Sequence, residues 1–201
     1  GAGRSPWTGE TIDGDYIKAE AQAGRMGQLL YAVAVKRPGG FDFRAPTAED
    51  VAAAERAEGE LARRWPVWQG QGLAIDEEIP YGHRANERDI IVQYGETEWQ
   101  HLFNKRQLFA LQTYLECLEQ LRTEIHSSKA KDQADAVLVY LAIALDKAAI
   151  YNNRHCRFDP GRGIRSIFDR HDFAFTWSHA EFDAEANLLP WVIDQVADAY
   201  K

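Results

Sequence analysis

The sequence is poor in cysteine, in basic relative to acidic residues, and in long apolar runs. Its 2 cysteines, Cys117 and Cys156, are too few for a disulfide framework or for a four-ligand zinc site. Since no signal-peptide pattern opens the chain, this cysteine usage predicts a cytoplasmic protein. The longest strongly apolar run, Ala136 to Leu145, is about half of the roughly 20 residues that a membrane span needs, so we expect no contact with a membrane.

Basic residues are also in deficit. Lys and Arg total 23 against 31 Asp and Glu, and the resulting net charge of −8 disfavours a protein that coats nucleic acid by bulk charge. A local basic face stays open as a hypothesis. The 201 residues are 45% hydrophobic and 27% charged, which is typical of one globular domain with a core of its own.

Several catalytic signatures are missing. Gly70-Gln71-Gly72 lacks the third glycine of a dinucleotide fingerprint, and the chain has neither a P-loop nor a Gly-x-Ser-x-Gly elbow. The 6 histidines form no His-x-x-x-His pair, so we expect no metal site. The segment from Phe158 to Gly163 echoes the Asp-Pro-Phe-x-Gly-x-Gly motif that holds S-adenosylmethionine, but it follows a predicted helix end instead of a strand. We interpret it as a turn, and we expect no catalytic or cofactor-binding residue in this chain.

The residue pattern predicts a mainly α (α+β) fold with a central antiparallel helix pair, a small N-terminal β-hairpin and long irregular loops. Leucines spaced three and four apart indicate a helix over 105–126, which Asn104 caps. A second helix over 133–153 contains the apolar run, and we expect it to be buried centrally. The expected core residues are Leu111, Leu115, Leu118, Val137, Leu141 and Leu145.

The chain is expected to form one insert domain, residues 1–201, of a larger protein. It opens on Gly1 without a methionine and ends at Lys201 inside a predicted helix, a pattern typical of a segment of a longer chain. The first expected subregion is a β-hairpin part over 1–47, with strands at 29–36 and 41–44, and it is followed by an acidic helix over 48–65 that Thr47 caps with Asp50. A long loop over 66–103, with a strand at 90–94, comes next. The last subregion is a helical core over 104–201, with a helical turn at 165–170 and a last helix from Pro190.

Arginine is concentrated in residues 154–170, which carry a local positive charge in an acidic protein. The guanidinium group presents a fixed fork of donors that suits phosphate and carboxylate groups alike. One hypothesis is therefore contact with nucleic acid or a partner, and the other is helix-end capping with internal salt bridges. The candidate DNA-binding residues are Arg25, Arg106, Asn152, Asn153, Arg154, Arg157, Arg162 and Arg165.

Short blocks in a fixed order carry a family resemblance. They are Tyr16-Ile17-Lys18-Ala19-Glu20, Ala23-Gly24-Arg25-Met26-Gly27, Leu102-Phe103-Asn104-Lys105-Arg106-Gln107-Leu108, Tyr151-Asn152-Asn153-Arg154-His155-Cys156-Arg157, Phe168-Asp169-Arg170-His171-Asp172-Phe173 and Thr176-Trp177. Together these blocks resemble the DUF1156-containing adenine-specific DNA methyltransferases, and they are spread over most of residues 5–201.

The resemblance implies a parent enzyme that uses S-adenosylmethionine, with its cofactor motif upstream and a catalytic Asp-Pro-Pro-Tyr downstream of such a segment. This chain has neither motif, so we expect it to be inactive alone, with no cofactor of its own. It has Ser5-Pro6-Trp7-Thr8-Gly9 where relatives carry a cysteine-based zinc knuckle, which argues against zinc here. The implied partners are the catalytic halves of the parent enzyme and DNA, in a DNA-recognition or scaffold role. The alternative is a non-catalytic helical interaction domain that packs on those halves or on a partner protein without touching DNA.

Overall fold

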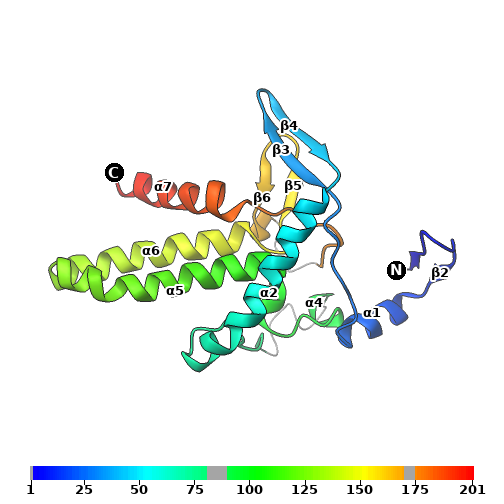
Figure 1. The fold of residues 1–201 in the computed structure, drawn as a ribbon, viewed down its shortest axis with the longest axis horizontal. Coiled ribbons are helices and arrows are strands. Elements are labelled where there is room, and N and C mark those ends of the chain that lie inside the picture. Colours follow the sequence, from blue (N-terminus) through cyan, green and yellow to red (C-terminus); the bar gives the residue numbers. More distant parts are fainter. Residues whose placement is uncertain (1, 81–89, 170–174) are drawn as a thin grey trace.

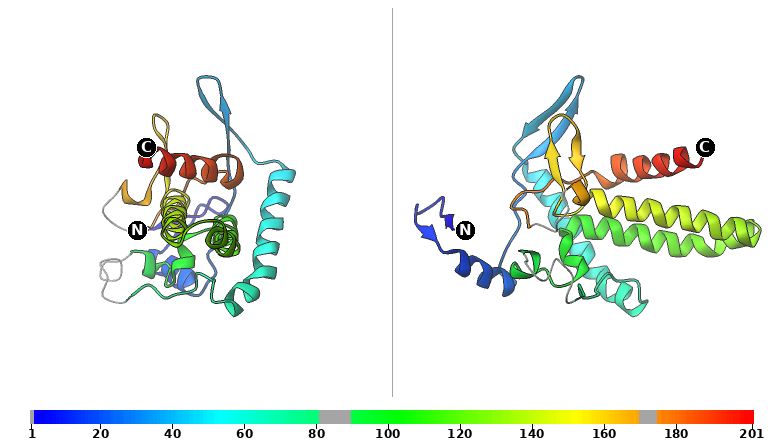
Figure 2. Two further views of the ribbon diagram at one scale, coloured as in Figure 1. Left: turned by 90° about the vertical axis from the view of Figure 1, so that its left-hand side faces the viewer. Right: turned by 180° about the vertical axis from the view of Figure 1, so that it is seen from behind.

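The fold is taken from a computed structural model, and the structure describes residues 2–80, 90–169 and 175–201. Helices dominate it, and small antiparallel strand pairs accompany them, which confirms the mainly α (α+β) fold class. Helices α5 (Lys105–Ser128), α6 (Lys131–Tyr151) and α7 (Leu189–Tyr200) run side by side and extend away from the remaining elements (Figures 1 and 2). We call these three helices the helical arm.

Local signals define where the arm begins. The Asn104 side chain accepts a hydrogen bond from the Gln107 backbone at 2.9 Å, and the Gln107 side chain accepts one from the Asn104 backbone at 2.9 Å. This capping box starts α5 at the predicted residue. A two-residue connection then returns the chain as α6, so the predicted antiparallel helix pair is confirmed. Pro190 lies in the first turn of α7, where its missing N–H costs no helical hydrogen bond.

Helix α2 (Ala48–Gly70) crosses the base of the arm (Figure 1). Thr47 and Asp50 form the predicted capping box at its start. The predicted end at residue 65 is wrong, because the helix continues through Pro66 to Gly70. A proline inside a helix costs about 3 kcal/mol. Packing offsets this cost, since Trp68 is completely buried against Leu61 and Leu108.

The N-terminal part contains both expected and unexpected elements. Strands β3 (Val33–Arg37) and β4 (Gly40–Arg44) form the predicted antiparallel hairpin, but the first strand begins at Val33 and not at the predicted residue 29. Strands β1 (Gly3–Arg4) and β2 (Thr11–Ile12) and helix α1 (Gly14–Gln22) precede it. Helix α1 was not predicted, because Asp13 followed by Gly14 is locally typical of a turn. In the structure Asp13 is the N-cap, and its side chain accepts a hydrogen bond from the Asp15 backbone.

The connection between α2 and α5 is more ordered than the predicted long loop. An isolated bridge pairs Glu78 with Glu98, and a 3₁₀ turn, η1, covers Trp99–Leu102. The predicted strand at 90–94 is wrong: α4 (Ile90–Gln93) is a short helix. Its β-branched residues favour a strand, but Ile91 is buried against Ile79 and Leu102, and this packing overrides the local preference. The predicted loop residues Gly82 and His83 lie outside the described residues.

The second half adds a hairpin that was not predicted. Strands β5 (Arg157–Asp159) and β6 (Gly163–Arg165) pair antiparallel and lie beside β3 and β4 (Figure 1). The Phe158 ring joins the two hairpins, since its centroid is 5.6 Å from that of Phe41 and 5.2 Å from that of Phe43. A 3₁₀ turn, η2 (Ile167–Asp169), lies within the predicted helical turn, and a π-helical turn, η3 (Ala184–Leu188), leads into α7.

The core is divided into separate clusters. One holds Ile79, Ile91 and Leu102 under α4, a second holds Leu61, Trp68 and Leu108 between α2 and α5, and a third joins α6 to α7 through Ala144, Ala148, Leu188 and Val192. Each cluster lies at or near the base of the arm, because that is where helices from different parts of the chain meet.

The expected central burial of α6 is wrong. Of the predicted core residues Leu111 is buried, whereas Leu115, Leu118, Val137, Leu141 and Leu145 are only partly buried. Val139 and Ile143 are exposed at 58% and 46%. The cause is geometric: α6 contacts α5 and α7 on two sides, and no described residue covers its third side.

Among the helices that the structure describes, none combines the length and apolar character needed to cross a membrane.

Candidate functional site

A group of buried polar side chains lies where α5 and α6 meet the α4 region. We call it the polar junction, and its members are Glu96, Asn104, Gln107, Asn152, Asn153, Arg154 and His155. Glu96 is only 2% exposed, although it is a carboxylate. Its Oε1 lies 2.9 Å from Nη1 of Arg154, and its Oε2 lies 3.1 Å from Nε2 of His155. A buried carboxylate needs such partners, so this contact fixes the α4 region to the end of α6.

Backbone contacts hold Arg154 in the same place. Its Nη1 also donates to the His101 carbonyl at 2.8 Å, and its backbone N–H donates to the Leu102 carbonyl at 2.7 Å. The Thr176 hydroxyl donates to the Arg154 carbonyl at 2.6 Å. The Arg154 side chain is therefore mostly buried, at 17% exposure, and does not lie on the exposed surface that a DNA contact by this residue would need.

The two asparagines at the end of α6 are internal connectors. Asn152 Oδ1 accepts hydrogen bonds from Gln107 Nε2 at 3.2 Å and from the Phe182 backbone at 3.0 Å. Asn153 donates to the Ala149 carbonyl at 2.8 Å, and its Oδ1 accepts from the His155 backbone at 2.9 Å. Both side chains are buried, so their hydrogen bonds satisfy the orphan carbonyl groups and loop amides of the helix end.

Arg106 and Glu181 form a second internal ion pair next to the junction. Arg106 donates to both Glu181 oxygens, at 2.9 and 2.7 Å, and Asn104 donates to the same carboxylate at 2.6 Å. The hydrogen bond to Glu181 raises the pKa of Arg106. His179 lies 3.2 Å from the Asn104 amide nitrogen, and burial lowers the pKa of His179. This two-point arginine–carboxylate contact holds the segment before α7 on the start of α5.

The arginines of the second hairpin share one carboxylate. Arg157 and Arg165 are directly opposite each other in β5 and β6, and both donate to Asp169. The hydrogen bonds from Arg165 and Arg157 lower the pKa of Asp169 to about 2. Arg162 lies in the exposed turn between these strands and has no ion-pair partner in the described part of the chain.

Arg25 lies apart from the other candidates. It donates from Nε and Nη2 to the two oxygens of Glu20 at 2.6 and 2.8 Å, just beyond the end of α1. The predicted residues thus divide between the polar junction, the second hairpin and the end of α1, and they do not form one face. The carboxylate partners Glu96 and Glu181 were not predicted, because pairs far apart in the sequence leave no local pattern. Glu20 was not predicted either, although it lies only five residues before Arg25.

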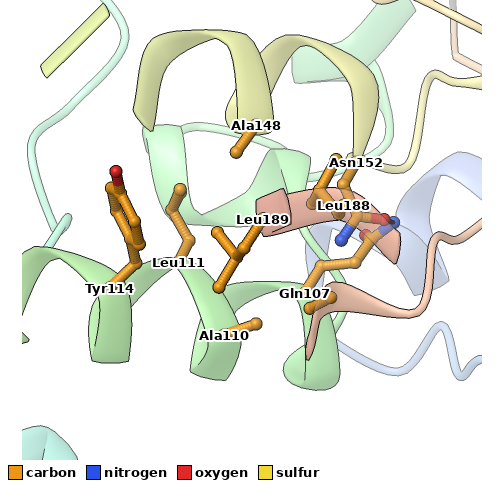
Figure 3. Close-up of a pocket in the computed structure, with 9 residues that line it drawn as sticks. Gln107, Ala110, Leu111, Tyr114, Ala148, Asn152, Leu188 and Leu189 are labelled. Carbon is orange, nitrogen blue, oxygen red and sulfur yellow. Dashed lines mark hydrogen bonds between the residues drawn. The ribbon is translucent and has the colours of Figure 1, made fainter. Parts of the chain in front are cut away.

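A small cavity opens between α5, α6 and the start of α7 (Figure 3). Its lining residues are Gln107, Ala110, Leu111, Tyr114, Ala148, Asn152, Ala184, Leu188 and Leu189. The amides of Gln107 and Asn152, at one end in Figure 3, already bond to each other. At the other end, burial raises the pKa of Tyr114, which keeps its hydroxyl protonated. No charged side chain is among the described residues that line this cavity, so these residues supply no acid–base pair.

The segment that echoes a cofactor motif does not fit S-adenosylmethionine. Asp159 ends β5, Gly163 begins β6 and Gly161 lies in the turn between them, where the Asp159 carboxylate accepts the Gly161 N–H at 2.8 Å. The prediction that a helix end directly precedes this segment is wrong, because Phe158 and Asp159 belong to strand β5. The motif needs a loop that is free to bond to the cofactor, whereas the Asp159 carboxylate is engaged in its own turn. Burial also raises the pKa of the Cys156 thiol to about 11, so this cysteine is not a ready nucleophile.

No protein-family model, no curated protein and no solved structure matches this chain.

Proposed function

We propose that this chain is a non-catalytic helical interaction segment of an adenine-specific DNA methyltransferase that uses S-adenosylmethionine. In this role it packs on the catalytic halves of the enzyme or on a partner protein, and it does not hold DNA through its candidate arginines. The methyltransferase part of the proposal comes from the sequence resemblance. The interaction part comes from the arrangement of charges and exposed apolar groups.

The observation that carries the interaction role is the pairing of the candidate arginines with carboxylates of the same chain. Arg106 bonds to Glu181, Arg154 lies against Glu96, and Arg25 bonds to Glu20. A guanidinium group that already has a carboxylate must give up that partner to bind a phosphate, and this lowers the gain from the new contact. The helical arm, in contrast, exposes apolar side chains on α6 that no described residue covers.

A salt titration of DNA binding tests the interaction role. Anisotropy of a labelled 20-base-pair duplex would be measured with the 201-residue chain at several salt concentrations. An interaction segment is expected to bind weakly, and alanine at Arg157 and Arg162 is expected to leave the salt slope unchanged. A DNA-holding segment would instead lose up to about two units of slope in this variant. Lys129→Ala/Lys131→Ala, at the far end of the arm, is the matched control.

The proposal that this chain is a segment of a methyltransferase can be tested independently by sequencing the gene on both sides of it. We expect its flanking sequence to encode a glycine-rich cofactor motif before this segment and Asp-Pro-Pro-Tyr after it. Flanks with neither motif would contradict the placement. This test does not depend on whether the segment binds DNA.

DNA recognition is a second candidate, and Arg162 favours it. This side chain is exposed in a turn, beside glycines that allow close approach of a phosphate backbone, and it has no competing carboxylate in the described residues. Phe41 and Phe43 on the neighbouring hairpin are also exposed, at 45% and 56%. An Arg162→Ala variant that lowers the salt slope by about one would favour this second candidate.

A further inference from the structure

Helix α6 has one face that neither neighbouring helix covers. Ala144 and Ala148 pack against α7, and the Tyr114 hydroxyl of α5 donates to the Leu141 carbonyl at 3.4 Å. These contacts occupy two sides of the helix. We call the remaining side the outer face of α6. Its exposed members are Asp132, Asp135, Ala136, Val139, Ala142, Ile143 and Asp146.

The order of residues on this face is regular. Asp135, Val139, Ala142 and Asp146 follow one another at spacings of four, three and four, which places them in one row along a helix. The apolar centre is small, and a carboxylate lies at each end of it. With a rise of 1.5 Å per residue, the Asp135 and Asp146 positions lie ~16 Å apart along the axis.

These carboxylates have little internal compensation. Asp132 and Asp146 form no ion pair with any residue in the described ranges, and Asp135 has only His126, whose Nε2 is 3.7 Å away. Lys131, which is next to Asp132 and four residues before Asp135, forms no ion pair with either aspartate in the described ranges. Lys147, next to Asp146, lies over the rings of Trp191 and Tyr151 at 5.0 and 5.9 Å, on the side that faces α7. The outer face therefore combines an apolar centre with negative ends.

We propose that the outer face of α6 is a docking site for an amphipathic helix of a partner protein that carries Lys or Arg on both sides of a small apolar centre. The inference rests on the proposed interaction role and names the chemistry of the partner. Exposed apolar residues at helical spacing accept a second helix as a ridge. The carboxylates at both ends then select a partner whose cations are about three turns apart.

The same charges argue against a second copy of this chain as the occupant. In an antiparallel pair of outer faces, Asp135 of one copy would meet Asp146 of the other. In a parallel pair, each carboxylate would meet its own equivalent. Either arrangement brings like charges together, which lowers the affinity of one copy for another. A basic helix would instead bring opposite charges together, which raises its affinity for this face.

A charge-swap experiment tests the site. The probe is a labelled 18-residue helical peptide with an Ala/Leu face and two lysines eleven positions apart on that face, and the matched peptide has glutamates in their place. We expect the 201-residue chain to prefer the lysine peptide. Asp135→Lys/Asp146→Lys should lower the affinity for the lysine peptide ~tenfold or more and should raise the affinity for the glutamate peptide by a comparable factor.

Two further variants locate the effect. Val139→Ser/Ile143→Ser should weaken binding of the lysine peptide ~tenfold through the lost apolar contact. Glu49→Lys/Glu55→Lys on α2 changes charge by the same amount elsewhere and should leave the affinity within about twofold. Equal affinity of wild type and the α6 charge swap for both peptides would overturn the proposal, as would a stable dimer that Val139→Ser/Ile143→Ser dissociates. Gene flanks without methyltransferase motifs would overturn the placement in the parent enzyme and leave this docking site standing.

Discussion

Arg154 Nη1 lies 2.9 Å from Glu96 Oε1, and both side chains are largely removed from solvent. This ion pair joins the end of α6 to the segment after α4, so an arginine that the sequence offers as a DNA contact is held inside the molecule. Its position also explains why Glu96 is buried: the same carboxylate meets His155 with its other oxygen. The polar junction is therefore a structural joint at the base of the helical arm.

Replacing Glu96 with Gln should destabilise the chain strongly. The amide keeps the shape but removes the negative charge, which leaves the Arg154 guanidinium uncompensated in a buried site. We expect a loss of about 3–5 kcal/mol in the free energy of unfolding, measured by urea denaturation at pH 7. Glu119→Gln, which affects an exposed pair with Arg122, should cost less than about 1 kcal/mol. Similar losses in the two variants would show that the junction contributes no more than a surface pair.

Gly95 should be intolerant of any side chain. Its φ is +79°, and a Cβ there would lie 2.6 Å from the Ala21 carbonyl oxygen. Gly72 has a similar φ of +68°, but a Cβ there would meet nothing within 4 Å. Gly72→Ala should therefore cost only the left-handed strain of about 1–2 kcal/mol, and Gly95→Ala should cost clearly more. Equal thermal unfolding shifts for the two variants would mean that α1 does not pack on this turn.

The division of the core predicts unequal effects of leucine truncation. Leu108 is 2% exposed and packs with Leu61 and Trp68, so Leu108→Ala should cost about 2–5 kcal/mol. Leu141, which the sequence analysis assigns to the core, is only partly buried. We expect Leu141→Ala to cost about 1–2 kcal/mol in the same urea experiment. A larger loss of stability in Leu141→Ala than in Leu108→Ala would show that packing within the helical arm contributes more to stability than packing between α2 and α5.

Asp169 should make stability depend on acidic pH. Its folded pKa of about 2 lies below the usual value of 3.8 for an aspartate because Arg165 and Arg157 donate to it. A lowered carboxyl pKa stabilises the fold fully above the unfolded pKa, and this contribution is lost as the pH falls from about 4 to below about 2. Asp169→Asn should therefore be less stable than wild type at pH 7, and the difference should be small near pH 2 and vanish below it. A constant difference over this range, by circular dichroism in urea, would exclude the carboxylate as its source.

The sequence determined the elements whose signals are local. Asn104 with Gln107 and Thr47 with Asp50 start their helices where predicted, because a capping box needs only residues three apart. The first hairpin is predicted from two strand patterns, at 29–36 and 41–44, that are close in the sequence, and leucine periodicity predicts α5. These patterns were sufficient for the mainly α (α+β) fold class and for the antiparallel helix pair.

Tertiary structure alone decided which groups meet across the chain. The continuation of α2 through Pro66 depends on the burial of Trp68, and the helical form of α4 depends on the burial of Ile91. Helical periodicity marks α6 as apolar, but whether its outer face is covered depends on how many neighbours the fold supplies. The partner of Arg154 was hidden for a related reason: ion pairing depends on distance in space, and Glu96 comes close only after the α4 region has packed on the end of α6.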